Sequence, residues 1–185
     1  MNEAAFIQSA VQQFRDYKIL GEKTFAQISD SAFHFQPNEW TNSIAINITH
    51  LHGNMLSRWT DFLTTDGEKE WRQRDAEFEN SWNTRDDVMK TWDSGWKCLF
   101  DALNSITDED LERIIYIRNE GQTVLDAIQR QLAHYPHHVG QILYQAKAIK
   151  GNDFKSLSIP KGASADFNKA KFSEEKRIRH FTDKL

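Results

Sequence analysis

The sequence predicts an all-α protein, an up-down four-helix bundle with a long loop between its second and third helices and a C-terminal tail. Apolar residues recur at helical spacing over four long segments, and strand-like alternation is nearly absent. Only three prolines and eight glycines interrupt 185 residues, which favours long helices over a many-turned β fold. Residues 1–152 are therefore expected to form the bundle, and residues 153–185 the tail.

The first helix is expected from about Glu3 to about Ile28. Its apolar residues fall at steps of three and four, which places them on one helical face: Phe6, Ala10, Phe14, Tyr17, Gly21, Phe25 and Ile28. The polar run Ser29-Asp30-Ser31 suits the loop that follows.

The second helix is expected to begin near Asn42 or Ser43, since either residue could cap it. Its apolar stripe consists of Ile44, Ile48, Leu51, Met55, Trp59 and Phe62. Asp66-Gly67 is a turn signal that ends the helix. The segment from Glu68 to Asn83 is rich in charge, and we interpret it as a long loop held by its aromatic residues Trp71, Phe78 and Trp82.

The third helix is expected to begin at Thr84, because Thr84 and Asp87 have the spacing of a capping box. Its buried stripe consists of Val88, Trp92, Trp96, Leu99 and Leu103. The segment from Arg113 to Arg118 is rich in β-branched residues and suits a short extended segment. Asn119-Glu120-Gly121 then predicts a turn.

The fourth helix is expected from about Thr123 to about Lys150, where Gly151 would end it. Its stripe is the longest in the chain: Val124, Ile128, Leu132, Tyr135, Val139, Ile142, Ala146 and Ile149. Pro136 lies inside this segment and predicts a kink, because proline lacks an N–H donor and clashes with the preceding turn. The tail is expected to hold a short helix near Ser173 to Arg179.

Charge and composition exclude several functions. The net charge of −4 argues against a nucleic-acid-binding protein, and the longest basic run, at residues 176–179, suits a solvated tail. No apolar stretch approaches the roughly 18 residues that span a bilayer, and the N-terminus lacks the pattern of a signal peptide. Cys98 is the only cysteine, so no intrachain disulfide can form, which fits a reducing cytoplasm.

Five of the seven histidines fall in two tight groups, His50-Leu51-His52 and His134-Tyr135-Pro136-His137-His138. Residues four apart on a helix share a face, with Cβ atoms about 5–6 Å apart, so His134 and His138 can point at one ion. A third ligand must come from the second helix. Helical periodicity leaves His50 and His52 both open, because His52 lies nearer the apolar centre of that helix.

Polar residues accompany these histidines on both helices. Gln131, His134, His138, Gln141 and Gln145 lie on one line of the fourth helix, and Asn47, His50, Asn54 and Asp61 on a line of the second. These two stripes could build a polar pocket inside the bundle. Three protein ligands with open positions are typical of a catalytic metal site, and imidazoles accept Zn, Ni or Fe alike. Histidines four apart are nevertheless common on helices without metal.

Other catalytic signatures are missing. Tyr135 stands where a zincin-type metalloprotease carries its catalytic glutamate, and the chain has neither a glycine-rich phosphate loop nor a nucleophile elbow. Cys98 lies among apolar neighbours and is expected to be buried and inert. The sequence therefore assigns no catalytic residue.

Several of these residues resemble a known group. Ser43-Ile44-Ala45 leading into His50-Leu51, and His134-x-x-x-His138 followed by Gly140-Gln141, resemble the DinB/YfiT-like superfamily over roughly residues 5 to 150. The loop from Thr64 to Lys69 resembles one uncharacterised bacterial subfamily of that group. The resemblance implies a four-helix bundle, often a homodimer, whose metal ligands match His50, His134 and His138. Many relatives carry a basic residue where this chain has Val139.

The resemblance also implies a choice of functions. Known members include thiol-S-transferases, which join a low-molecular-weight thiol such as bacillithiol to an electrophile, and others are suggested to be metal-dependent hydrolases of small molecules. A metal ion suits both reactions, because it lowers the pKa of a bound thiol or water. No Asp or Glu lies within one turn of His134 or His138, which weakens the hydrolase version.

Three further residues are candidates for the site. Asn54 could orient a ligand or a water molecule, and Gln141 could hold a ligating histidine in place. His52 is a candidate for a contact beside the metal. The alternative function is a non-catalytic, stress-related binding or scaffold module with a vestigial metal site.

Overall fold

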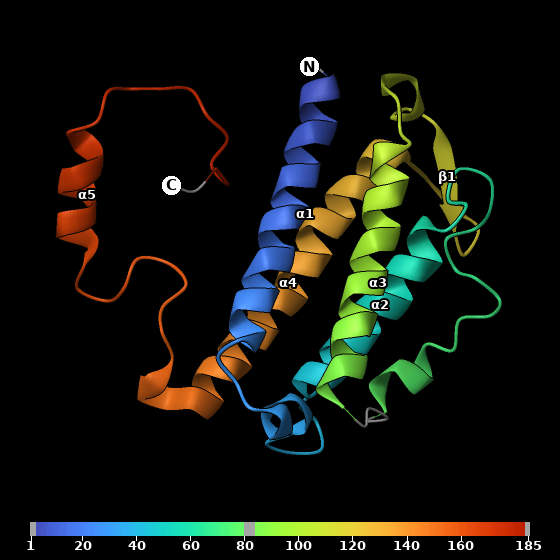
Figure 1. The fold of residues 1–185 in the computed structure, drawn as a ribbon. Helices are drawn as coiled ribbons and strands as arrows, with labels where there is room; N and C mark the ends of the chain where they lie inside the picture. Colours follow the sequence, from blue (N-terminus) through green and yellow to red (C-terminus); the bar gives the residue numbers. More distant parts are fainter. Residues whose placement is uncertain (1–2, 80–83, 184–185) are drawn as a thin grey trace.

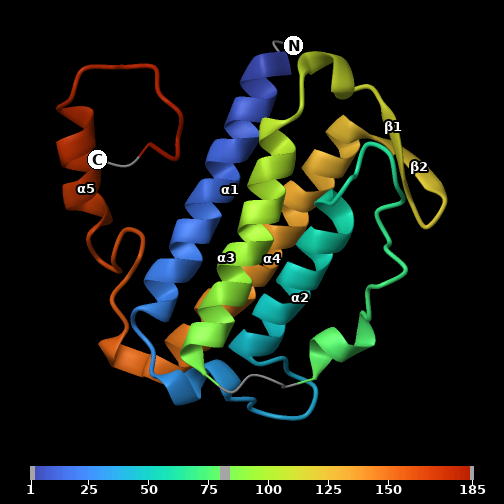
Figure 2. The same cartoon turned by 45° about the vertical axis from the view of Figure 1, so that its right-hand side comes forward.

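The computed structural model describes residues 3–79 and 84–183 and is mostly helical, with one small sheet. Four long helices, α1 (Glu3–Phe25), α2 (Ile44–Trp59), α3 (Arg85–Asn104) and α4 (Val124–Lys150), lie side by side (Figures 1 and 2). Helix α2 packs on α3 and α4, and α1 packs on α3 and α4. The histidine-bearing helices α2 and α4 are therefore direct neighbours.

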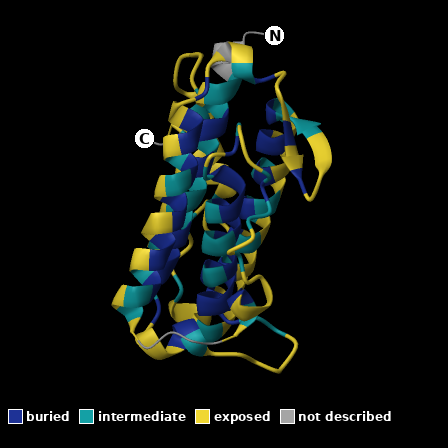
Figure 3. Cartoon of the chain, turned by 90° about the vertical axis from the view of Figure 1, so that its right-hand side faces the viewer, coloured by how far each residue is buried: buried dark blue, intermediate teal, exposed yellow. Residues whose placement is uncertain are grey.

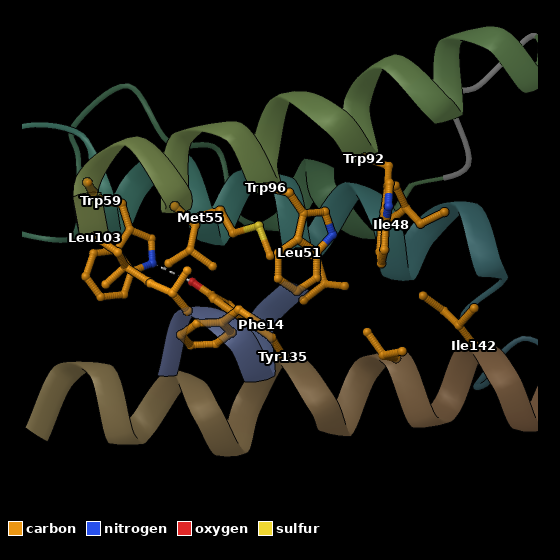
Figure 4. Close-up of a cluster of buried hydrophobic side chains, with 14 of the residues drawn as sticks. Phe14, Ile48, Leu51, Met55, Trp59, Trp92, Trp96, Leu103, Tyr135 and Ile142 are labelled. Carbon is orange, nitrogen blue, oxygen red and sulfur yellow. Dashed lines mark hydrogen bonds between the residues drawn. The ribbon is translucent and has the colours of Figure 1, made fainter. Parts of the chain in front are cut away.

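The core lies between these four helices, and Figure 3 shows the buried residues on their inward faces. Its centre is aromatic (Figure 4): Phe14, Trp96 and Tyr135 are fully buried, and each contacts the other two. Burying a large apolar side chain contributes roughly 1.5–3 kcal/mol. The predicted stripes of the long helices supply most of this core.

The helix starts agree with the sequence, whereas two helix ends do not. Ser43 and Thr84 cap α2 and α3, since each side-chain oxygen accepts a backbone N–H three residues ahead. Helix α1 ends at Phe25 instead of near Ile28. Helix α2 ends at Trp59, because Asp61 has a φ of 47° and breaks the helical path. Phe62, expected on the α2 stripe, is buried from the following turn instead.

The predicted extended segment is confirmed as strand β1 (Ile114–Ile117), which pairs antiparallel with β2 (Glu120–Thr123). The turn between them is Arg118-Asn119, not the predicted Asn119-Glu120-Gly121. Both turn residues are left-handed, with φ values of 57° and 64°. The Asp66 carboxylate compensates this strain, because it accepts the backbone N–H groups of Arg118 (2.8 Å) and Asn119 (2.9 Å).

The long loop after α2 is held mainly by buried charges rather than by aromatic residues. Trp71 is 56% exposed, so it does not anchor the segment. Glu77 in the short 3-10 helix η2 (Asp75–Phe78) is 7% exposed, and it is paired with the buried guanidinium of Arg72. Trp82, the third predicted anchor, lies outside the described residues.

The predicted tail helix is in the wrong place. Helix α5 covers Ser164–Phe172, and residues 173–179 are not helical. Asp166 in the first turn of α5 and lysines in its last turn suit the helix dipole, whereas three like charges crowd residues 176–179. Helix α5 is drawn apart from α1–α4 in Figures 1 and 2, and the chain then returns to α1, where His180 and Ser9 share a hydrogen bond of 2.9 Å.

Among the described residues, no helix combines the length and apolar character that crossing a bilayer requires.

Candidate metal centre

Three histidines from two helices converge. His50 comes from α2, and His134 and His138 come from successive turns of α4. One ring nitrogen from each lies within 4.8 Å of the other two, and His134 Nε2 is 3.2 Å from His138 Nε2. His52, the alternative on α2, is not part of this group, because its ring and backbone pack against Gly95 of α3. His50 and His52 are two residues apart on α2 and therefore point in different directions, His50 toward α4 and His52 toward α3.

The Nδ1 atom of His50 faces a carboxylate. It lies 2.9 Å from Glu77 Oε2, and an ionised carboxylate can only accept, so Nδ1–H donates. Partial burial of Glu77 would raise its pKa, but hydrogen bonds from His50 and Arg72 hold the pKa below the ordinary value. The carboxylate therefore stays charged and fixes the tautomer and orientation of the imidazole.

Side-chain amide oxygens fix the orientation of the two histidines of α4. His134 Nδ1 lies 3.1 Å from Gln131 Oε1, and His138 Nδ1 lies 2.9 Å from Gln141 Oε1. Asn47 Oδ1 approaches His138 Nδ1 at 3.3 Å from α2. All three Nδ1 atoms thus donate to oxygen, which leaves the three Nε2 lone pairs free to accept a cation.

The electrostatics of the group fit a cation as well. Burial lowers the pKa of His134 to about 3, helped by the neighbouring histidines, and burial likewise lowers the pKa of His138 to about 4. Both rings are neutral at pH 7, so two lone pairs face each other across 3.2 Å. Zn–N bonds of about 2.0–2.1 Å in a tetrahedral site would separate two nitrogens by about 3.3 Å. His50, His134 and His138 therefore form a group that could hold a metal ion.

Glu77 and Arg72 are the site residues that sequence patterns missed. Arg72 donates to both carboxylate oxygens of Glu77, at 2.7 and 2.9 Å, and its side chain is only 2% exposed. Gly53 leaves room for the Glu77 carboxylate beside α2, because a Cβ at position 53 would collide with Glu77 Oε1. The sequence marks these two residues only indirectly, through a glycine inside the second helix and a charge-rich loop after it.

An aromatic ring covers His50 on the other side. Phe78 stacks on the imidazole, with ring centroids 5.0 Å apart and an interplanar angle of 29°. The Arg74 guanidinium lies in turn over Phe78, 5.0 Å from its centroid. The loop between α2 and α3 therefore supplies two contacts to His50, the carboxylate of Glu77 and the ring of Phe78.

A cavity of about 270 Å³ opens directly onto the group. His50 and His134 form part of its wall, together with Asn54 and Gln131. The rest of the wall is basic: Arg58, Arg72, Arg74, Arg118 and Arg130. A small molecule can therefore reach two of the three histidines from a strongly basic chamber.

The orientation of Asn54 is fixed from the core. Trp59 Nε1–H donates to the Tyr135 hydroxyl at 2.9 Å, and that hydroxyl donates to Asn54 Oδ1 at 3.1 Å (the Trp59–Tyr135 bond is dashed in Figure 4). Because its oxygen is bound by Tyr135, Asn54 has its amide nitrogen available as a donor at the wall of the basic cavity. Tyr135, which replaces the glutamate of a zincin motif, acts here as a buried link between α2 and α4.

A second cavity of about 670 Å³ lies behind His138. Its wall includes Asn47 and Gln141, the two partners of His138 Nδ1, together with the exposed aromatic residues Phe35, Trp40 and Tyr144. The wall of this second cavity is largely apolar, and His138 is linked to it through Asn47 and Gln141. Two cavities of opposite character therefore flank the group.

Comparison with known proteins gives a family but no activity. No curated protein and no solved structure matches the chain. A family model described as "protein of unknown function (DUF1572)" matches residues 2–163, which is most of the chain. The chain therefore belongs to the DUF1572 family.

Proposed function

We propose that this protein is a divalent-metal-dependent enzyme on a DinB-like four-helix bundle of residues 1–152, and that it transfers a low-molecular-weight thiol to an electrophile. One observation carries the proposal: one ring nitrogen from each of His50, His134 and His138 lies within 4.8 Å of the other two, while each Nδ1 atom lies within hydrogen-bonding distance of a side-chain oxygen. Zn, Ni and Fe all suit this donor set. We further propose a cytoplasmic homodimer, as the resemblance to DinB-like proteins implies.

The residues present suggest what each group would contribute. His50, His134 and His138 would hold the ion, and three protein ligands would leave positions open for a reactant. When bound, such an ion lowers the pKa of a thiol or a water molecule and thereby supplies a nucleophile at neutral pH. Glu77, Gln131 and Gln141 hold the ring orientations, and Asn54 offers a donor to the reactant.

Thiol transfer is favoured over hydrolysis by the position of the carboxylates. Hydrolysis gains from a side chain that removes a proton from water and delivers it to the leaving group. Glu77 is occupied by His50 and Arg72, and no acidic side chain of the described residues lines the basic cavity. In thiol transfer the thiol releases its proton to solvent, the ionised sulfur forms a bond to carbon, and the leaving group departs with its electron pair, so no side chain has to deliver a proton to it.

Metal analysis of matched variants tests the proposal. The protein, purified without chelator, is expected to contain about one divalent ion per chain, and His50→Ala and His134→Ala are expected to lose it. His52→Ala and His137→Ala are the controls, since each removes the histidine next to a proposed ligand. Metal content that is unchanged in His134→Ala, or lost in His52→Ala instead of His50→Ala, would overturn the assignment.

The reaction is tested separately. We expect the metal-loaded protein to accelerate the consumption of a thiol by an aryl halide such as 1-chloro-2,4-dinitrobenzene, with cysteine, glutathione and bacillithiol compared as thiols. His134→Ala should reduce the rate to that of the uncatalysed reaction. A metal-loaded protein that consumes none of these thiols but cleaves small esters would favour the hydrolase, and one that does neither would favour a binding module.

A further inference from the structure

The basic cavity beside the histidines holds more positive charge than its surroundings neutralise. Glu68 pairs with Arg58 (3.1 Å), Arg72 (3.4 Å) and Arg118 (3.2 Å) through one carboxylate oxygen. Arg72 also pairs with Glu77. One glutamate thus serves three guanidinium groups, and each of them keeps donors to spare.

The two remaining arginines are even less neutralised. Among the described residues, the only ion-pair partner of Arg74 is Asp75, at 3.9 Å, and that carboxylate is fully exposed. Arg130 has no hydrogen bond or ion pair with any residue that the structure describes. In the part of the chain that the structure describes, four carboxylates lie near these five guanidinium groups, those of Glu68, Glu77, Asp75 and Asp66, which leaves an excess of one positive charge around the cavity.

Hydrogen-bond donors without acceptors also indicate that the cavity suits an anion. Arg58 is 8% exposed, yet its Nε–H has no acceptor among the described residues. Asn54, whose oxygen is taken by Tyr135, presents its amide nitrogen as a further donor at the cavity wall. Buried donors without acceptors are rare in folded proteins, so the site is short of acceptor oxygens.

Arg118 reaches the cavity from a strained backbone. Its φ of 57° is left-handed, a conformation that costs a residue with a Cβ about 1–2 kcal/mol. Glycine or asparagine would suit this turn position better. The chain instead places an arginine there and holds it with the Asp66 carboxylate. Backbone strain of this kind gathers at binding sites.

We propose that the molecule bound at the metal centre carries a carboxylate or phosphate group, which Arg118 and Arg130 bind in the basic cavity. The proposal rests on the proposed metal function, because it assigns the anionic part of that same ligand. Guanidinium groups match the planar oxygens of both anions and bind them through paired, charge-assisted hydrogen bonds. The cavity volume of about 270 Å³ suits a small anionic group rather than a polymer.

Anion titration tests this inference. Inorganic phosphate and succinate are titrated by calorimetry into the purified protein, its Arg118→Gln/Arg130→Gln variant, and a charge-matched control. The control, Arg113→Gln/Arg177→Gln, removes two exposed arginines that do not line the cavity. We expect saturable binding to the wild type, at least a tenfold loss in the cavity variant, and a change of less than twofold in the control.

Two further measurements separate this inference from the proposed metal function. The metal content of Arg118→Gln/Arg130→Gln should equal that of the wild type, and His134→Ala should still bind an anion after it has lost the metal. Tighter binding of phosphate would assign a phosphate ester, and tighter binding of succinate a carboxylate, and either supports the inference. Absence of saturable binding to the wild type, equal affinity in the cavity variant and the control, or binding that disappears with the metal alone would overturn it.

Discussion

Glu77→Gln tests how the metal centre is supported, because it changes the charge of one side chain and almost nothing of its shape. The glutamine keeps one oxygen, which at the Oε2 position can still accept from both His50 and Arg72. Its amide nitrogen then faces the Nε–H of Arg72, which donates to Oε1 in the wild type. One buried donor is left without an acceptor, and the Arg72 charge without its main partner.

The magnitude follows from burial. The side chains of His50, Glu77 and Arg72 are 8%, 8% and 2% exposed, so solvent cannot replace the lost contact. Breaking a buried ion pair costs about 3–5 kcal/mol, and the remaining oxygen of glutamine places Glu77→Gln near the lower end, about 3 kcal/mol. Removing the partner of a metal-ligating histidine also weakens metal binding by about 10- to 100-fold.

Two assays separate these effects. Urea unfolding of the metal-free protein measures the stability loss, which we expect to lower the midpoint by about 1–2 M. Competition with a chromophoric chelator measures the metal affinity of the folded protein. Asp75→Asn, which neutralises a fully exposed carboxylate in the same 3-10 helix, is the control and should change neither quantity. A Glu77→Gln variant that unfolds with the wild type and binds metal within threefold of it would refute the reasoning.

Further predictions address the same loop and its neighbours. Gly53→Ala should destabilise the protein and weaken metal binding, because the new Cβ would collide with Glu77, although alanine is the better helix former by about 1 kcal/mol. Gly140→Ala on α4 should stabilise by about 0.5–1 kcal/mol, because a Cβ there would meet no described atom within 4 Å beyond its chain neighbours and its own helix backbone, and equal urea midpoints for the two variants would contradict both expectations. Asp66→Asn should cost about 1–2 kcal/mol at pH 7 through weakened hydrogen bonds to the turn at Asn119. Partial burial alone would raise the pKa of Asp66, but three backbone N–H groups lower it, so its stabilisation is present above about pH 4 and lost as the pH falls further. The gap between the unfolding curves of the wild type and Asp66→Asn should therefore close in acid, and a gap independent of pH would count against this role.

Local patterns predicted much of the helical structure. Periodicity identified the four long helices, and side-chain caps at Ser43 and Thr84 fixed two of their starts, because both signals depend on residues three or four apart. The same locality explains His134 and His138, which face one way through helical spacing alone. The end of α2 was predicted too late, because the apolar pattern continues to Phe62 whereas the backbone leaves the helical path at Asp61.

The rest of the site depends on contacts between distant segments. The choice of His50 over His52 follows from how α2 packs against α3 and α4, and periodicity alone could not make it. Glu77 lies in a loop without periodicity, so nothing in its neighbourhood marked it as buried. The turn at Arg118-Asn119 is stabilised by a carboxylate about fifty residues earlier, which displaces the turn from its local signal.

X-ray diffraction from crystals of the protein purified without chelator, recorded on both sides of the zinc, nickel and iron absorption edges, tests the metal centre most directly. We predict one anomalous peak, about 2.0–2.2 Å from the Nε2 atoms of His50, His134 and His138. An ion bound elsewhere, or imidazoles turned away from a shared point in crystals that contain metal, would contradict it.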